Sequence, residues 1–227
     1  MKTKVAFSIA SALFIASSHA QQTTNQALQE CANKVTAQSA VTGALVGGLL
    51  GALMGGDGKK NQAAAIGAGL GAAAGGAIGW QNSWKTCTEQ VNVVTVRNAQ
   101  TKDYQQTAER YGYKGEGVIF KLEGLGISEN VKAGSDMSSS FRVALLKPNP
   151  TENPQLQVNR SWKCGNTEIK VKPETFAIQQ GTVEQYGRVS VPAADASVGV
   201  QQCEMTIILE SEGLVQKASR QFSITPN

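Results

Sequence analysis

Glycine at every fourth residue is the feature that most constrains this chain. Inside a water-exposed helix each glycine costs about 1 kcal/mol relative to alanine, so eight of them need a compensating cause. In a bilayer the backbone must satisfy its own hydrogen bonds, which forces helix, and a stripe of small residues lets two helices approach closely. The pattern therefore predicts a helical hairpin packed through its glycines. Two runs carry it, joined by a polar turn at residues 56–61: Gly43, Gly47, Gly51, Gly55, then Gly67, Gly71, Gly75, Gly79.

The side chains around the stripe favour insertion into a membrane. Leucines such as Leu49 and Leu70 can face lipid, and we expect Trp80 and Trp84 at the membrane interface with Lys59 and Lys60 near lipid headgroups. As helices, residues 41–55 and 63–80 would extend about 22 and 27 Å, against a hydrocarbon core of roughly 30 Å. Insertion therefore requires local thinning, partial entry or self-association. The alternative is an Ala/Gly-rich hairpin buried in a soluble oligomer.

Two glycine runs around a short polar turn resemble the glycine-zipper transmembrane-hairpin family, typified by rickettsial-type surface antigens and SlyB-like outer-membrane proteins. The resemblance covers residues 41–80 only. It implies a structural role in a cell envelope and brings no catalytic residues, cofactor or metal ligands with it.

The first 20 residues have the pattern of a secretory signal peptide. Lys2 and Lys4 precede an apolar run of about a dozen residues, too short to span a membrane, and Ser18-His19-Ala20 is a typical cleavage site. We expect removal of this leader and export of the chain to the outer membrane or periplasm of a Gram-negative cell. An uncleaved anchor is the alternative.

The composition argues against an enzyme and against nucleic-acid binding. His19 is the only histidine, and it lies in the leader, so the mature chain has none for a catalytic triad or a His-based metal site. The mature net charge is +2, and the basic residues are scattered rather than clustered. We expect no catalytic residues, no cofactor and no metal.

Four cysteines in an exported chain predict disulfides. Three pairings are possible. Spacing favours the sequential one, in which Cys31 pairs with Cys87 across the glycine-rich region and Cys164 pairs with Cys203 in the C-terminal half.

From residue 115 onward the apolar period is two, which is typical of strands. Alternating runs include Phe141, Val143 and Leu145, and prolines fall between the runs. The predicted fold is α+β, with a glycine-zipper helical hairpin followed by an antiparallel, immunoglobulin-like β-sandwich. The expected division is a signal peptide at 1–20, a disulfide-closed hairpin at 21–90, a connector with a strand and a short helix at 91–114, and a β-sandwich at 115–227 that folds on its own.

Three functions are compatible with these features. The first is a structural envelope protein with membrane lipid as a partner, a possible homo-oligomer, that presents its β-sandwich to another envelope protein. The second is a periplasmic or surface binding and adhesion module that uses the hairpin only as a tether or for oligomerisation. The third is a self-assembling pore, because short close-packing hairpins can form rings.

The glycine stripe predicts that larger side chains at its positions disrupt helix packing. Replacing Gly47, Gly51 and Gly71 together by Leu should abolish the detergent-stable assembly, because the new side chains hold the helix backbones apart. The β-sandwich should keep its thermal unfolding transition. Gel filtration in detergent and circular dichroism test both expectations, and a triple variant that assembles like the wild type would count against the zipper.

Overall fold

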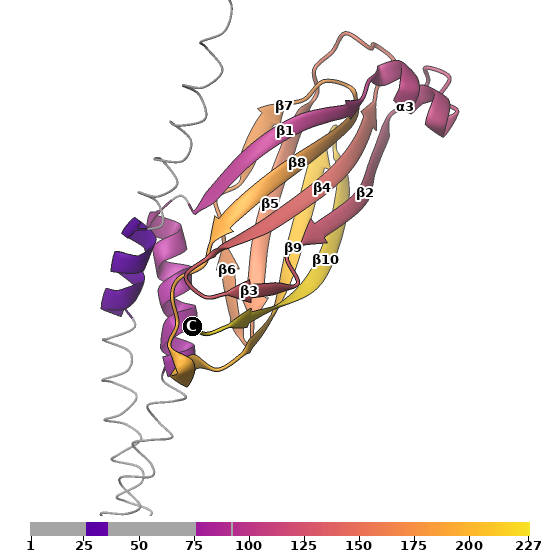
Figure 1. The fold of residues 1–227 in the computed structure, drawn as a ribbon. Coiled ribbons are helices and arrows are strands. Elements are labelled where there is room, and N and C mark those ends of the chain that lie inside the picture. The colour runs from indigo at the N-terminus through magenta and orange to yellow at the C-terminus, as the bar shows by residue number, and fades with distance from the viewer. Residues whose placement is uncertain (1–25, 36–75, 92) are drawn as a thin grey trace, which may run out of the picture.

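A computed structural model describes residues 26–35, 76–91 and 93–227 of the 227-residue chain. Helices cover residues 26–35 and 76–90. Two sheets follow and together form the β domain, residues 94–225 (Figure 1). Its elements are β1 (Val94–Lys102), α3 (Tyr104–Tyr111), β2 (Ile119–Ile127), β3 (Asn130–Lys132), β4 (Asp136–Leu146), β5 (Gln155–Cys164), β6 (Thr167–Lys170), β7 (Glu174–Ala177), β8 (Gly181–Ser190), the 3-10 helix η1 (Ala196–Val198), β9 (Gln201–Ser211) and β10 (Leu214–Thr225).

The strands form two layers. The first sheet has the order β1-β8-β4-β2, and the second has the order β3-β10-β9-β5-β6 with β7 also paired to β5 (Figure 1). Neighbouring strands are antiparallel except for β3, which pairs in parallel with β10. The two-sheet β region agrees with the predicted fold class. The immunoglobulin-like arrangement stays a prediction, and the Cys164–Cys203 bridge joins directly opposed residues of β5 and β9 within one sheet.

The core lies between the sheets because alternate residues of each strand point inward. In β4 these are Met137, Phe141, Val143 and Leu145, none more than 3% exposed. In the second sheet β5 and β9 contribute the facing layer. Its fully buried members are Leu156, Trp162, Met205, Ile207 and Leu209.

Strand β8, which lies between β1 and β4, was not recognised from the sequence. Its inward positions are Val183, Gln185, Gly187 and Val189, so two of the four lack an apolar side chain. Gln185 is 1% exposed and donates to the Asn98 side chain of β1 at 2.8 Å. Gln185 also accepts a buried hydrogen bond from Arg160, so polar partners take the place of an apolar contact at this position.

The predicted connector is part of the first sheet. Its strand is β1, which pairs with β8 from Val94 to Lys102, and its short helix is α3. A Cβ at Gly181 would lie 2.3 Å from the Lys102 carbonyl oxygen, so the β1 end and the β8 start approach too closely for any other residue. The β domain thus begins at Val94, and a fragment that starts at Gly115 lacks an edge strand.

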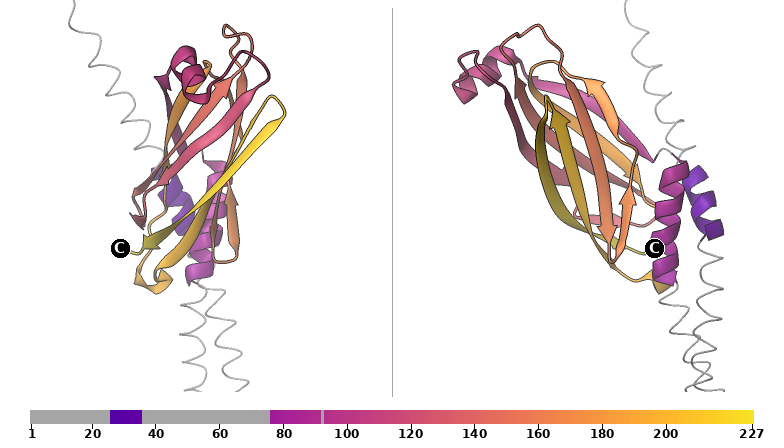
Figure 2. Two further views of the ribbon diagram at one scale, coloured as in Figure 1. Left: turned by 90° about the vertical axis from the view of Figure 1, so that its right-hand side faces the viewer. Right: turned by 180° about the vertical axis from the view of Figure 1, so that it is seen from behind.

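The two N-terminal helices lie beside the sheets along one flank (Figures 1 and 2). The Cys31–Cys87 disulfide joins them, which confirms the expected pairing. The predicted glycine-zipper hairpin falls mainly on residues 36–75, outside the described residues. None of the helices within the described ranges is long and apolar enough to cross a membrane.

A buried cation joins the sheets. Arg160 of β5 takes an inward position in the strand and is 3% exposed. Its guanidinium pairs with Glu174 of β7 at 2.9 Å, donates to the Gln185 side chain of the opposite sheet and lies 5.7 Å from the centre of the Phe141 ring. Burial lowers the pKa of Arg160, and the Glu174 carboxylate opposes that shift.

The Glu174→Gln variant should lower the free energy of unfolding by about 1–3 kcal/mol, because it leaves the buried guanidinium without its charged partner. Glu168→Gln is the matched control. Glu168 pairs with Lys170 at 3.2 Å on the surface, and such exposed pairs contribute roughly 0–1 kcal/mol. Urea titration of both variants measures the difference, and equal costs would show that Arg160 does not depend on Glu174.

Candidate functional site: the junction of helix 76–90 with the β domain

One face of helix 76–90 is part of the protein core. Residues three and four apart lie on the same side of a helix, so a buried stripe at that spacing marks the face packed against the sheets. The stripe consists of Trp80, Ser83, Trp84, Cys87 and Thr88, none more than 5% exposed. Asn82, Lys85 and Glu89 occupy the solvent face. The helix is therefore amphipathic toward protein.

Three tryptophans carry the contact between the helix and the second sheet. The Trp80 and Trp84 rings lie 5.4 Å apart between centroids, and Trp84 stacks on Trp162 of β5 at 6.0 Å and 26°. Each of the three is at most 1% exposed. Offset or tilted aromatic pairs at these distances contribute about 0.5–1.5 kcal/mol each beyond the area they bury.

Hydrogen bonds fix the position of both helices on the segment after β8. The Trp80 indole N–H lies 3.2 Å from the Pro192 carbonyl oxygen and 3.1 Å from that of Ala193. From the other helix, the Gln29 amide accepts from the Ala193 backbone N–H at 2.7 Å and donates to the Val191 carbonyl at 3.3 Å. The 191–193 segment is thus shared by the two helices.

A polar contact extends the junction to the turn between β5 and β6. The Gln81 amide donates to the Gln201 side chain at 2.7 Å and accepts from the Thr167 hydroxyl at 3.0 Å. Gly165 in that turn has φ +57°, and a Cβ there would lie 3.4 Å from the Gln81 amide nitrogen. Glycine suits both the left-handed backbone and the close approach.

The two disulfides lie at either side of this junction. Cys87 follows Trp84 in the buried stripe and ties the helix to Cys31, while Cys164 follows Trp162 on β5 and pairs with Cys203. None of the cysteines in the described ranges is free. In the chain-entropy model each loop closure would add about 4 kcal/mol to stability.

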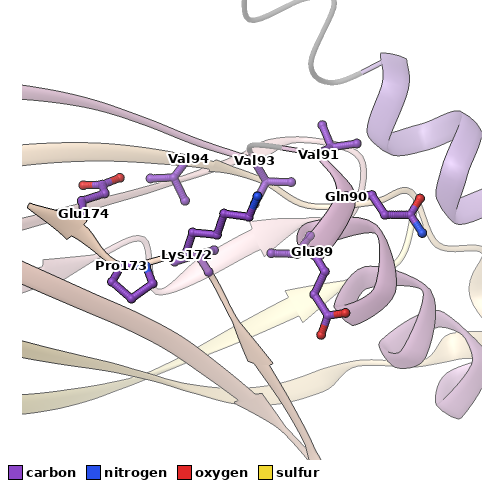
Figure 3. A pocket seen from close by; sticks show the side chains of 10 residues that line it. Glu89, Gln90, Val91, Val93, Val94, Lys172, Pro173 and Glu174 are labelled. Atoms are coloured by element: carbon purple, nitrogen blue, oxygen red, sulfur yellow. The ribbon is translucent and has the colours of Figure 1, made fainter.

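Two clefts border the helix. One of about 330 Å³ lies between the end of the helix and β1 on one side and residues 171–174 on the other (Figure 3). Its charged side chains are Glu89, Lys172 and Glu174, of which Glu174 is already paired with Arg160. The other, about 520 Å³, is a polar groove between Lys85 on the helix and the β5–β6 hairpin. Among the described residues no group of three His, Cys, Asp or Glu side chains could hold a metal.

At the opposite end of the β domain, α3 is fixed to β2 through Glu123. The Tyr111 hydroxyl donates to this carboxylate at 2.7 Å, and Arg110 pairs with it at 2.8 Å. Partial burial, together with the Glu123 carboxylate, raises the pKa of the Tyr111 hydroxyl. An open hollow on α3 is lined by Tyr104, Tyr113 and Lys114.

The structure corrects the prediction for the two tryptophans. Trp80 and Trp84 are buried against the β domain, so their indoles do not lie at a membrane interface. The sequence did contain a signal for this burial, because Trp80, Trp84 and Cys87 are spaced to lie on one face of a helix. Among the predicted packing glycines Gly79 is described and is buried. The remaining seven, together with Lys59 and Lys60, lie outside the described residues. Arg160, Gln81 and the stacking role of Trp162 were not predicted from the sequence, because the polar contacts and the ring partner come from distant elements.

A family model confirms the glycine-zipper resemblance over the N-terminal part of the chain. Residues 1–83 match the YMGG-like Gly-zipper family. The match runs through the glycine stripe and ends inside helix 76–90, just before Trp84. It includes none of the β domain. No match to the chain was found among curated proteins.

Several solved structures resemble part of the chain, with TM-scores below 0.5. A conjugative transposon lipoprotein from Bacteroides eggerthii is 11% identical with a TM-score of 0.26, covering 46% of this chain and 95% of that one. Superoxide reductase (neelaredoxin) from Ignicoccus hospitalis is 12% identical with a TM-score of 0.30, covering 47% and 80%. AggA, the major subunit of aggregative adherence fimbriae type I from Escherichia coli, is 5% identical with a TM-score of 0.29, covering 48% and 96%. At these TM-scores the similarity does not indicate a function for this chain.

Trp84→Ala should lower the free energy of unfolding by about 3–5 kcal/mol, because it removes the central ring of the stack and leaves a cavity. Ile78→Ala, on the same helix but 56% exposed, should change it by less than about 0.5 kcal/mol. Denaturant titration of the oxidised chain compares the two variants. Equal small effects would show that the helix does not pack on the sheets.

Proposed function

We propose that this chain is a non-enzymatic structural protein of a bacterial cell envelope, associated with a membrane through its glycine-zipper segment. The observation that carries the proposal is the overlap at residues 76–83. The glycine-zipper match ends in the same helix whose inner face is built into the core of the β domain. The membrane segment and the β domain would therefore be rigidly joined and act as one unit.

Two features support export. Both disulfides pair cysteines of the same chain, and structural disulfides persist in oxidising compartments such as the periplasm. The N-terminal 20 residues have the composition of a secretory leader. The outer membrane or the periplasm of a Gram-negative cell is the proposed location.

The β domain would serve as the part that meets other proteins. Its surface carries short strands and loops on a disulfide-stabilised scaffold, which is where binding residues are commonly placed. We propose an envelope protein as partner, and self-association through the zipper as the means of presenting several copies.

Site-specific labelling tests insertion of the hairpin. Residues 57–60 carry charges whose burial without partners costs several kcal/mol, so the turn must reach one face of the bilayer while Cys31 and Cys87 stay on the other. In Gly58→Cys, with the native pairs left oxidised, an impermeant thiol reagent should react from one side only. In Lys85→Cys, two residues before Cys87, the new thiol should react with the same reagent from the opposite side.

Equal labelling of both positions from the periplasmic side of intact membranes would contradict a spanning hairpin. The chain would then be a peripheral or soluble oligomer, and the binding and adhesion module would become the better explanation. Labelling with the wild-type chain provides the background, because its described cysteines are all paired.

A further inference from the structure

One end of the β domain lies next to Gly76, the residue that follows the glycine-rich stretch 41–75 in the sequence. The described part of this helix begins at Gly76, and a Cβ at this glycine would lie 3.0 Å from the Ser197 hydroxyl oxygen of η1. Five residues later Gln81 contacts Gln201, the first residue of β9. We call this end, formed by helix residues 76–81, η1 and the start of β9, the base.

The base exposes two large apolar side chains. Ile78 is 56% exposed and Val200 is 59% exposed. Ile78 lies on the solvent face of the helix, two residues after Gly76, and Val200 directly precedes β9. The nearby Asp195 carboxylate accepts from the Ser197 backbone N–H at 2.9 Å as the cap of η1.

The other end of β9 has a different character. The last residues of β9 and the turn after it carry Glu210 and Glu212, and Lys147 pairs with both Glu152 and Glu212. Leu214 and Val215, which follow the turn, are 41% and 57% exposed, so this end sets its apolar side chains beside a cluster of carboxylates. A bilayer interface accepts isolated apolar side chains and disfavours clusters of carboxylates. The charged end is therefore the one that should face water.

Resting on the proposed membrane association, we propose that the base is a lipid-contacting surface and that Ile78 and Val200 insert among the headgroups of the bilayer. The argument for this occupant is the chain itself. Residues 41–75, rich in Gly, Ala and Leu, end directly at Gly76, so a membrane that holds them lies beside the base. Apolar side chains at such a position enter about 5–10 Å into the headgroup boundary. The β domain then stands on the membrane by its base, with the β9–β10 turn pointing away.

Two exposed valines, one just before β9 and one at the start of β10, give a matched test. Val200 is 59% exposed at the base, and Val215, next to the β9–β10 turn, is 57% exposed. The full-length oxidised chain carrying Val200→Cys or Val215→Cys is labelled with an environment-sensitive fluorophore. It is then reconstituted in vesicles of phosphatidylcholine and phosphatidylglycerol. Quenching by lipids that carry a nitroxide near the headgroup reports contact with the bilayer, and Ile78→Cys gives a second probe at the base.

The label at Val200 should be quenched at least about twofold more strongly than the label at Val215. Equal quenching, stronger quenching at Val215, or quenching at neither site in a chain that floats with the vesicles would overturn the proposal, leaving membrane association intact. A chain that does not float with the vesicles would overturn the proposed function together with this inference. Contact with a second copy of the chain is distinguished by its dependence on protein concentration at fixed lipid ratio, and that result would also overturn lipid contact.

Discussion

The stacking of Trp84 on Trp162 is the contact on which the arrangement of this molecule depends. It brings a helix that continues from the glycine-zipper segment into the core of a two-sheet β domain. Without it, helix 76–90 would be an amphipathic helix with nothing to cover its apolar face. Trp80 fixes the orientation of the helix, because its indole N–H donates to backbone carbonyl oxygens of the segment after β8. Packing supplies the free energy of the junction, and hydrogen bonds set its position.

The buried polar groups give the two sheets a fixed relation. Arg160, Gln185 and Asn98 connect β5 to β8 and β1 through the core, with Glu174 balancing the charge from the edge. Replacing such a network by apolar residues can leave stability unchanged, but breaking one partner is costly. The hydrogen bonds of this network are directional, so they favour one relative position of the two sheets.

Much of the β domain could be predicted from period-two alternation, including the strands around Phe141, Trp162 and Cys203. The spacing of the four cysteines predicted both disulfide pairs. The strands that escaped prediction, such as β8, place glutamine and glycine where the pattern expects apolar residues. Trp80 and Trp84 were assigned to a membrane interface because aromatic residues after an apolar segment are typical of one. The sequence does not say which apolar surface a helix meets. Here the partner was Trp162, more than 75 positions away, and only the fold brings the two together.

Only three residues, 91–93, separate helix 76–90 from strand β1, so the link between them is short. Its pairing with β8 is antiparallel and continuous from Val94 to Gln100. Hydrogen bonds in such a ladder run across the strands, so a pull along β1 loads many of them at once rather than one after another. A force applied at the helix would meet the tryptophan stack first and then this ladder in shear. Resistance to such a force would therefore come from the helix contact on the second sheet and from the β1–β8 ladder of the first.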